Sequence, residues 1–412
     1  MLRLVTHHHH LRNFARSYAT FSSGISIPVL SATKRIVRVE QLPDGYDLSD
    51  VVGELCASPV EAIIPSPNHI SLRFFAKTLA RRYRQKNNDR LYVKIDEQVR
   101  TAPLSAFTIA AFGRYGLSLR FVIDGIPETM GVEELKALLF GTQRVVSCRL
   151  EGTRADVRVL SLHQAMRFLL VLKESPQFKD CRMSFIDEDD YMYPEWYSPS
   201  KEGSKDLKRT VVIDNILSPQ TSIAIRGWVS SFDKQIAGLV YGRLRPEQNM
   251  MRLRFVSPDL ARQFISKFGD QSDRLNVRVT LVDGSSAEDG EVSNPGEHRS
   301  LVTAVSMGAC RTLLVQFDKA HHVEKSEYRA FFGQFGSIAL MTEQKWYDEL
   351  RVLVQYEDVR DAMQAIVSLS IPGKGHLYEG ASVNFLGADH LQPIFIVNSP
   401  SQSILHLEES NM

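Results

Sequence analysis

Short apolar segments recur along the chain in one fixed order, and this order predicts four copies of a single folding unit. The first segment of each copy begins near Ile36, Phe121, Val211 and Leu313, so a copy starts roughly every 90 residues. Within each copy, periodicities near two and near 3.6 residues predict a strand, a helix, two strands, a second helix and a closing strand. Repeats of solenoids and propellers are mostly about 20 to 50 residues long, so each copy is a small domain.

Local signals support the individual elements. The segment Ile70–Phe74 alternates apolar and polar residues, which is typical of a half-buried strand. The stretch Val132–Phe140 predicts a helix that ends at Gly141. Ser257 followed by Pro258 is typical of a helix start, with Ser as the N-cap and Pro in the first turn. In unit one, the first helix is expected around Leu48–Cys56.

These segments predict the following division of the chain. Residues 1–30 form a leader, 34–100 unit one, 118–187 unit two, 188–207 an acidic aromatic linker, 208–283 unit three, 284–308 a flexible linker, 310–387 unit four and 388–412 a tail. The second linker is rich in Gly, Ser and Glu, so we expect it to separate unit four from the other three. A short apolar run at Pro393–Val397 predicts one further strand in the tail.

The first 39 residues contain no Asp or Glu. Arg3, Arg12 and Arg16 are interspersed with leucines and followed by several Ser and Thr residues, as in a mitochondrial transit peptide. The run Arg16–Ala19 resembles a matrix processing site with the cut after Tyr18. A disordered basic tail is the alternative. The sequence therefore predicts import into the mitochondrial matrix, and the histidines His7–His10 fall within the removed segment.

Charge and composition limit the function further. The net charge is +1, but the residues up to Tyr115 hold 16 Lys and Arg against 9 Asp and Glu, so unit one is basic. The four cysteines are far apart and form no CxxC, which indicates neither a zinc site nor a disulfide framework. No apolar run is long enough to predict a membrane span. Phosphate-binding loops and hydrolase motifs are also lacking, so we expect neither an enzyme nor a cofactor.

The four units together resemble RNA recognition motif (RRM) domains over roughly three quarters of the chain. The most specific likeness is Phe331–Ile338, which is very similar to the passage from first helix to second strand in that family. The opening strands Phe121–Pro127 and Thr210–Ile216 match the family's first-strand pattern. The resemblance implies an α+β chain of four tandem ferredoxin-like βαββαβ domains. Each would have a four-stranded antiparallel sheet, with two helices on one face and a platform for single-stranded RNA on the other.

The platform positions depart from the family. RRM platforms stack bases on aromatic rings, one on the first strand and two on the third. Alignment on the strand pattern places no Phe, Tyr or Trp at these positions. The first strands hold Arg38, Val122, Val212 and Leu314, and the third strands hold His69 and Ser71, Arg154 and Asp156, Met250 and Arg252, and Arg351 and Leu353.

Arginine is the residue type that replaces the rings most often. A guanidinium plane can stack on a base or contact a phosphate, so the sheet candidates for RNA binding are Arg38, Arg73, Arg154, Arg158, Arg252, Arg254 and Arg351. A second basic group, Arg81, Arg82 and Arg84 with Lys86, lies late in the second helix of unit one. The alternative for each is a solvated surface or a surface packed on another domain or protein. Trp346 and Tyr347 are expected in the loop between the second and third strands of unit four, and Trp228 in the core of unit three.

Two hypotheses follow. The first is a mitochondrial matrix protein that binds single-stranded RNA of organellar transcripts and acts in their processing, stability or translational activation without catalysis. The second is a protein-interaction or structural factor whose RRM-like sheets bind the mitochondrial ribosome or other matrix proteins. The missing rings favour the second hypothesis, and the family resemblance with the leader favours the first.

Overall fold

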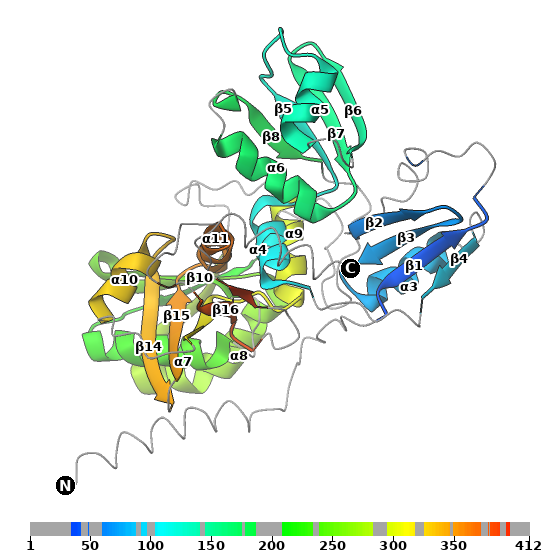
Figure 1. Cartoon of the computed structure of the whole chain (residues 1–412). Coiled ribbons are helices and arrows are strands. Elements are labelled where there is room, and N and C mark those ends of the chain that lie inside the picture. Colours follow the sequence, from blue (N-terminus) through cyan, green and yellow to red (C-terminus); the bar gives the residue numbers. More distant parts are fainter. Residues whose placement is uncertain are drawn as a thin grey trace. The chain divides into compact units, whose positions relative to one another are not determined.

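The computed structural model of the chain (Figure 1) describes the residues in the following ranges. They are 34–42, 48, 60–87, 92–96, 104–140, 145–174, 178–186, 208–233, 239–282, 295–317, 325–346, 349–371, 378, 380–387 and 393–395. The leader, the first helix expected in unit one, the linker 188–207, Tyr347 and most of the tail lie outside these ranges.

Domain 2 follows the predicted element order, and so do the described elements of domain 1, whose first helix lies outside the described residues. Domain 1 contains β1 (Ile36–Glu40), β2 (Val60–Ser66), β3 (His69–Phe74), α3 (Lys77–Asn87) and β4 (Tyr92–Ile95). Domain 2 contains β5 (Arg120–Asp124), α5 (Val132–Phe140), β6 (Val145–Glu151), β7 (Arg154–Val159), α6 (Leu162–Glu174) and β8 (Arg182–Phe185).

Domains 3 and 4 repeat this order. Domain 3 contains β9 (Thr210–Asp214), α7 (Pro219–Asp233), β10 (Leu239–Arg245), the 3₁₀ turn η2 (Pro246–Gln248), β11 (Met250–Phe255), α8 (Pro258–Leu275) and β12 (Arg278–Val282). Domain 4 contains β13 (Thr312–Phe317), α10 (Lys325–Gly333), β14 (Ile338–Trp346), β15 (Glu349–Tyr356), α11 (Val359–Leu369), β16 (Ser382–Phe385) and β17 (Ile394–Phe395).

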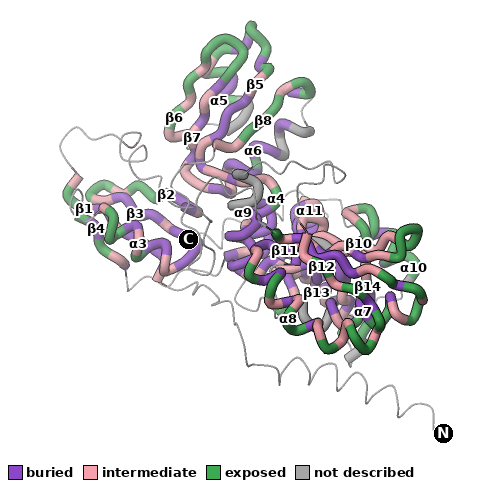
Figure 2. Tube along the Cα trace, turned by 180° about the vertical axis from the view of Figure 1, so that it is seen from behind, coloured by how far each residue is buried: buried purple, intermediate pink, exposed green. Residues whose placement is uncertain are grey.

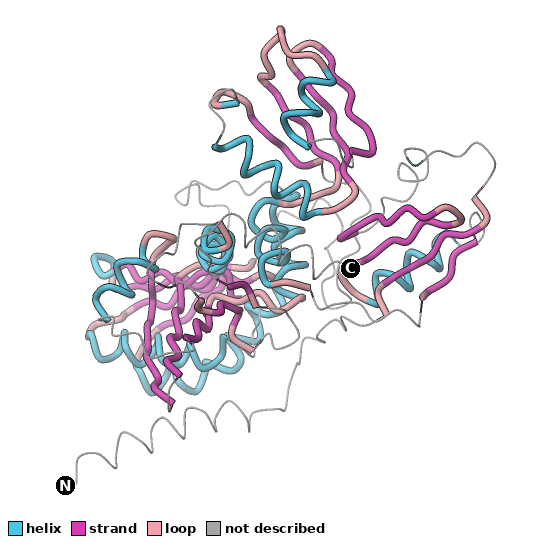
Figure 3. The backbone as a smooth tube through the Cα atoms, in the orientation of Figure 1, coloured by secondary structure: helices cyan, strands magenta, loops and turns pink. Residues whose placement is uncertain are grey.

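The four sheets share one topology. The strand orders are β2-β3-β1-β4, β6-β7-β5-β8, β10-β11-β9-β12 and β14-β15-β13-β16-β17, and every pair is antiparallel. The first and third strands are therefore central in each four-stranded sheet. This confirms the predicted α+β, RRM-like fold, and β17 confirms the strand expected in the tail. Figure 3 shows the helices and strands along the backbone.

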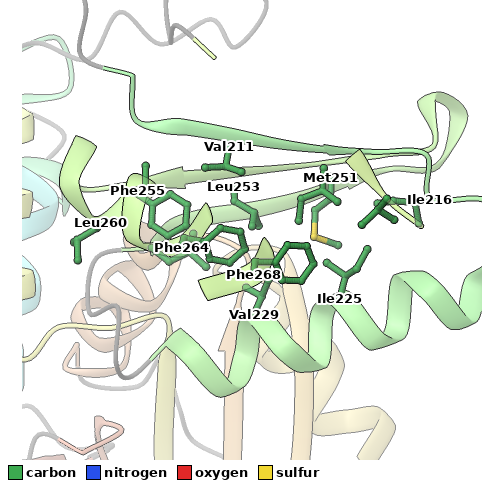
Figure 4. Packing of buried hydrophobic residues seen from close by; sticks show 14 residues of the cluster. Val211, Ile216, Ile225, Val229, Met251, Leu253, Phe255, Leu260, Phe264 and Phe268 are labelled. Atoms are coloured by element: carbon green, nitrogen blue, oxygen red, sulfur yellow. The ribbon is translucent and has the colours of Figure 1, made fainter. Parts of the chain in front are cut away.

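The core of domain 3 shows how helices cover only one face of each sheet. Val211, Leu253 and Phe255 point from the strands toward Phe264 and Phe268 of α8, and Ile225 and Val229 of α7 complete the cluster (Figure 4). Trp228 packs against this cluster, with its ring centroid 4.6 Å from that of Phe268. Burying these side chains drives the helices onto one face. The residues between them in the strands are left on the opposite face.

Two connecting segments form helices that the sequence did not predict. Helix α4 (Ala106–Tyr115) joins domains 1 and 2, and helix α9 (Pro295–Ser306) precedes domain 4. The second half of the linker 284–308 is thus helical, and the expectation of a flexible linker is wrong there. Helix α4 is buried along most of its length (Figure 2), and only Arg114 in its last turn is exposed, which is typical of a helix enclosed by other elements.

These helices change which domains belong together. Helix α4 contacts both α9 and α11, and the Tyr115 hydroxyl donates to the Gln364 side chain over 3.0 Å. Phe112 stacks edge-on against Phe75 of domain 1, and the Ile63 amide donates to the Leu160 carbonyl of domain 2. The chain accordingly divides into one unit that contains domain 3 (Lys208–Gly284) and another that contains domains 1, 2 and 4. The expectation that domain 4 stands apart is wrong, since domain 3 is the separate one.

The glycine of the most specific family-like segment has a steric reason. A Cβ on Gly336 would lie 2.2 Å from Cγ of Asp361, which follows the N-cap Asp358 at the start of α11. Only a residue without a side chain lets the turn before β14 approach this helix so closely. The segment Phe331–Ile338 therefore serves the packing of domain 4.

The same close approach predicts a pH effect. Burial raises the pKa of Asp361 from 3.8 to about 6, aided by the nearby Asp358 carboxylate. Protonation of Asp361 therefore stabilises domain 4 fully below pH 3.8, and this contribution is lost as the pH rises through about 6. Asp361→Asn should stabilise the protein at pH 7 by about 1 kcal/mol, allowing for solvent screening of this partly buried group. Thermal unfolding at pH 7 and pH 4.5 measures this. An equal gain at both values would contradict it.

Candidate nucleic-acid interface

The strand registers test the alignment of the platform positions. Each first-strand position lies directly opposite its third-strand position, in the pairs Arg38 and Ser71, Val122 and Asp156, Val212 and Arg252, and Leu314 and Leu353. These pairs lie on the sheet faces that the helices leave uncovered. The central platform positions are therefore placed as the sequence predicted, and none of them holds an aromatic ring.

Domain 3 carries the most basic platform. Register places Arg243 beside Arg252, Tyr241 beside Arg254, and Arg245 beside Met250 on the β10–β11 pair. Arg278 of β12 lies opposite Asp214 of β9. Five arginines from three strands thus share one face: Arg243, Arg245, Arg252, Arg254 and Arg278. Among the strand residues described on that face, Asp214 is the only acid, and Arg278 contacts it at 3.3 Å.

Like charges lie directly opposite each other on this platform. Arg243 and Arg252 are cross-strand neighbours, and Arg254 follows Arg252 by two residues on the same face. Like-charged pairs directly opposite each other destabilise a sheet. The register therefore gathers positive charge on the β10–β11 pair of this face.

Domain 2 offsets part of its platform charge internally, with three acids (Asp124, Glu151 and Asp156) among five arginines (Arg120, Arg149, Arg154, Arg158 and Arg182). Arg120 donates to both carboxylate oxygens of Asp156, with the shortest contact at 2.5 Å, and Arg154 lies 3.8 Å from Asp124. The hydrogen bond from Arg120 lowers the pKa of Asp156. Arg158 lies opposite Arg120 in the register. Two of the predicted candidates, Arg154 and Arg158, thus lie on this face beside acidic neighbours.

Domain 1 also balances its charges. Arg38 contacts Asp96 at 2.6 Å, and Arg73 contacts Glu61 at 3.2 Å. The buried Arg35 shares Glu61 and donates to the Phe74 carbonyl over 2.9 Å. At the far edge, Lys94 contacts Glu40 at 3.0 Å, and this hydrogen bond raises the pKa of Lys94. Both predicted arginines of this platform are therefore held in ion pairs with carboxylates that are largely buried.

The basic helix of domain 1 lies on the other side of the sheet. In α3, Leu79, Ala80 and Tyr83 are buried toward the sheet, whereas Arg81 and Arg84 are exposed and Arg82 is half-buried. Helix α3 covers the sheet face opposite the platform. The structure therefore does not bring Arg81, Arg82 and Arg84 together with Arg38 and Arg73.

Domain 4 has a nearly neutral platform. Leu314 and Leu353 lie at its centre, flanked in the register by Thr342 and Asn384. The candidate Arg351 contacts Glu349 at 3.0 Å. Trp346 is the last residue of β14, so the prediction that it lies in the loop after that strand is wrong.

Three arginines of the domain 3 platform were not predicted. Arg243 and Arg245 lie in the second strand, which the sequence placed at Ala237–Tyr241 but which extends from Leu239 to Arg245. The alternation of Gly242, Arg243, Leu244 and Arg245 is the signal that would have found them. Arg278 lies on the edge strand β12, outside the family's usual ring positions.

Other chemistry is limited in the described part of the chain. There, no three His, Cys, Asp or Glu side chains gather to hold a metal ion. None of the described helices is long and apolar enough to cross a membrane. Cys148, Cys181 and Cys310 are free thiols, and burial raises the pKa of Cys148 and of Cys181.

Known proteins were compared with the chain in sequence and in structure. No family model matches it, and no curated protein matches it significantly. Among solved structures, RNA recognition domains 1 and 2 of Sex-lethal from Drosophila melanogaster align with 16% identity over 40% of this chain and 100% of theirs, at a TM-score of 0.22. Three RNA-binding domains of the yeast splicing factor Prp24 align with 12% identity over 60% of this chain and 90% of theirs, at a TM-score of 0.14. The Caenorhabditis elegans NONO-1 homodimer aligns with 12% identity over 61% of this chain and 94% of its own, at a TM-score of 0.18. At these values the assignment of four RRM-like domains rests on the strand orders above.

Proposed function

We propose that this chain is a non-catalytic RNA-binding protein of the mitochondrial matrix, acting on organellar transcripts in processing, stability or translational activation. One observation carries the proposal: five arginines gather on the uncovered sheet face of domain 3, where RRM-like folds present their platform. The acid-free, Arg-bearing leader supports the compartment. Arg side chains supply charge for phosphates and flat surfaces for bases.

A second function, binding of the mitochondrial ribosome or another matrix protein, is favoured by domain 4. Its platform is nearly neutral and places Leu314 and Leu353 at the centre, and Leu340 is 42% exposed. Phosphate has little to bind on such a face, whereas apolar side chains at the centre of a polar surface are typical of protein interfaces. The two functions are compatible, because they use different domains.

Crosslinking in cells tests the first function. Ultraviolet irradiation of cells that express the full chain, followed by fractionation and sequencing of bound RNA, should recover transcripts of the organelle. A matched chain without residues 1–30 should lose its mitochondrial RNA, because the leader directs import. Recovery of the full chain from mitochondria without crosslinked RNA would contradict RNA binding and leave the protein-interaction function. Recovery outside mitochondria would contradict the compartment.

A further inference from the structure

We infer that the domain 3 platform binds the phosphate backbone of single-stranded RNA and is largely indifferent to base sequence. The inference rests on the proposed RNA-binding function and specifies its substrate class. It departs from the usual RRM platform, in which rings on the first and third strands hold individual bases.

The spacing of the arginines suits a line of phosphates. Neighbouring strands lie about 4.8 Å apart, and successive residues on one face of a strand lie about 6.6 Å apart. Arg243 and Arg252 are neighbours across strands, and Arg254 and Arg245 lie one step away from them along their own strands. Arg278 lies on the opposite edge of the sheet. Guanidinium groups therefore extend from edge to edge across the face, with each long side chain able to reach a different phosphate.

Groups that distinguish bases are scarce on the same face. The remaining described positions are Thr210, Val212, Thr280, Val282, Met250, Asp214 and Tyr241. The hydroxyls of Thr210 and Thr280 can each donate or accept a hydrogen bond, so they do not distinguish one base from another. Asp214, the one carboxylate among these positions, contacts Arg278. Affinity on this face therefore derives from charge, which carries no sequence information.

The other platforms lack this character. In domains 1 and 2, Arg38, Arg73, Arg120 and Arg154 each contact a carboxylate of their own domain. The domain 2 face holds three acids, Asp124, Glu151 and Asp156, against its five arginines, so it offers phosphate a smaller net positive charge than the domain 3 face. Domain 4 places only Arg351 on the corresponding strands, beside Glu349. Among the described strand residues, the domain 3 face therefore has the largest net positive charge, and we expect phosphate to bind there first.

Salt-dependent binding of the full chain tests the inference. Oligonucleotides of about 15 nucleotides of U, A or C, labelled for fluorescence anisotropy, should bind with affinities within about fivefold of one another. With about four phosphates neutralised, log affinity should fall against log salt with a slope of about −3. Arg252→Gln should weaken the binding of all three oligonucleotides equally and reduce the magnitude of the salt slope by about 0.7. Arg252→Lys should retain the slope, and Arg262→Gln on the exposed surface of α8 should change nothing.

Each contrary outcome has its own meaning. A preference of about 100-fold for one base would contradict binding through the phosphate backbone, and so would an equal loss of affinity in Arg252→Gln and Arg252→Lys. RNA binding itself would stand in both cases. A slope near zero would contradict binding through the phosphate backbone as well. If none of the three oligonucleotides binds at low salt, the RNA-binding function proposed above fails together with the inference.

Discussion

Replacing Gly113 by Leu is expected to destabilise the unit of domains 1, 2 and 4 by about 3 kcal/mol or more, while leaving domain 3 intact. A Cβ on Gly113 would lie 2.6 Å from Cβ of Ala304 in α9 and 2.7 Å from Sδ of Met363 in α11. The methionine can move its flexible end. The alanine Cβ is fixed to its backbone, so α4 and α9 must separate.

The buried residues around Gly113 do not easily accommodate this separation of the two helices. Ala110, Ala111 and Phe112 beside Gly113 are buried, and so are Ser300 and Thr303 of α9. Small residues on both helices allow their backbones to approach closely, and interiors at this density transmit strain. The Leu side chain would also push α4 away from Gln364, which the Tyr115 hydroxyl now contacts.

Hydrogen exchange of the full chain measures the effect domain by domain. Amides of α4, α9 and α11 should exchange faster in the Gly113→Leu variant, and amides of β9 and β11 should be unchanged. Gly227→Leu is the matched control, because nothing lies within 4 Å of its added Cβ on α7. That change should be neutral or slightly stabilising, since Leu favours a helix over Gly. Equal loss of protection in all four domains of the Gly113 variant would show that domain 3 is not a separate unit.

The contrast between α4 and the domain elements shows what the sequence allows one to predict. Strands such as β11 and helices such as α5 carry alternation, caps or glycine stops, and their predicted bounds agree with the structure. Helix α4 is short, is followed by Gly116 and is mostly apolar, with Arg114 as its one charged residue, so it has no clear amphipathic period to detect. Helix α9 begins at Pro295, directly after a stretch rich in Gly, Ser and acids that dominates the composition of the linker.

The interface was predictable only in part, for a different reason. The platform positions follow from the strand pattern, so the absence of rings was correctly predicted. Which arginines have acidic neighbours depends on tertiary contacts: Arg38 and Asp96, for example, are far apart in the sequence. Arg243 and Arg245 were not predicted because the predicted second strand of domain 3 ended at Tyr241, whereas β10 extends to Arg245. The overall charge of each unit could not show that the platform of domain 3, and not that of the basic domain 1, holds the most arginines against a single described acid.

The double charge reversal Arg252→Glu with Arg254→Glu is therefore expected to lower RNA affinity about 100-fold or more at low salt. Five arginines and one aspartate give the domain 3 platform four net positive charges, and two reversals reduce this to zero. Arg252 and Arg254 lie on a central strand, so every path of a phosphate chain across the sheet passes near them.

The fold should withstand this change, which makes the loss of binding interpretable. A carboxylate at position 252 would face Arg243 across the strands and replace a repulsive pair with an attractive one. We therefore expect the midpoint of thermal unfolding to stay constant or rise while affinity falls. The control Arg262→Glu with Lys267→Glu makes the same change in charge on the exposed surface of α8, behind the sheet. If the control lost as much affinity as the platform variant, net charge and not the arginine face would govern binding. If neither variant lost affinity, the RNA would bind to another domain, and the basic helix α3 would be the next surface to test, by reversing Arg81 and Arg84.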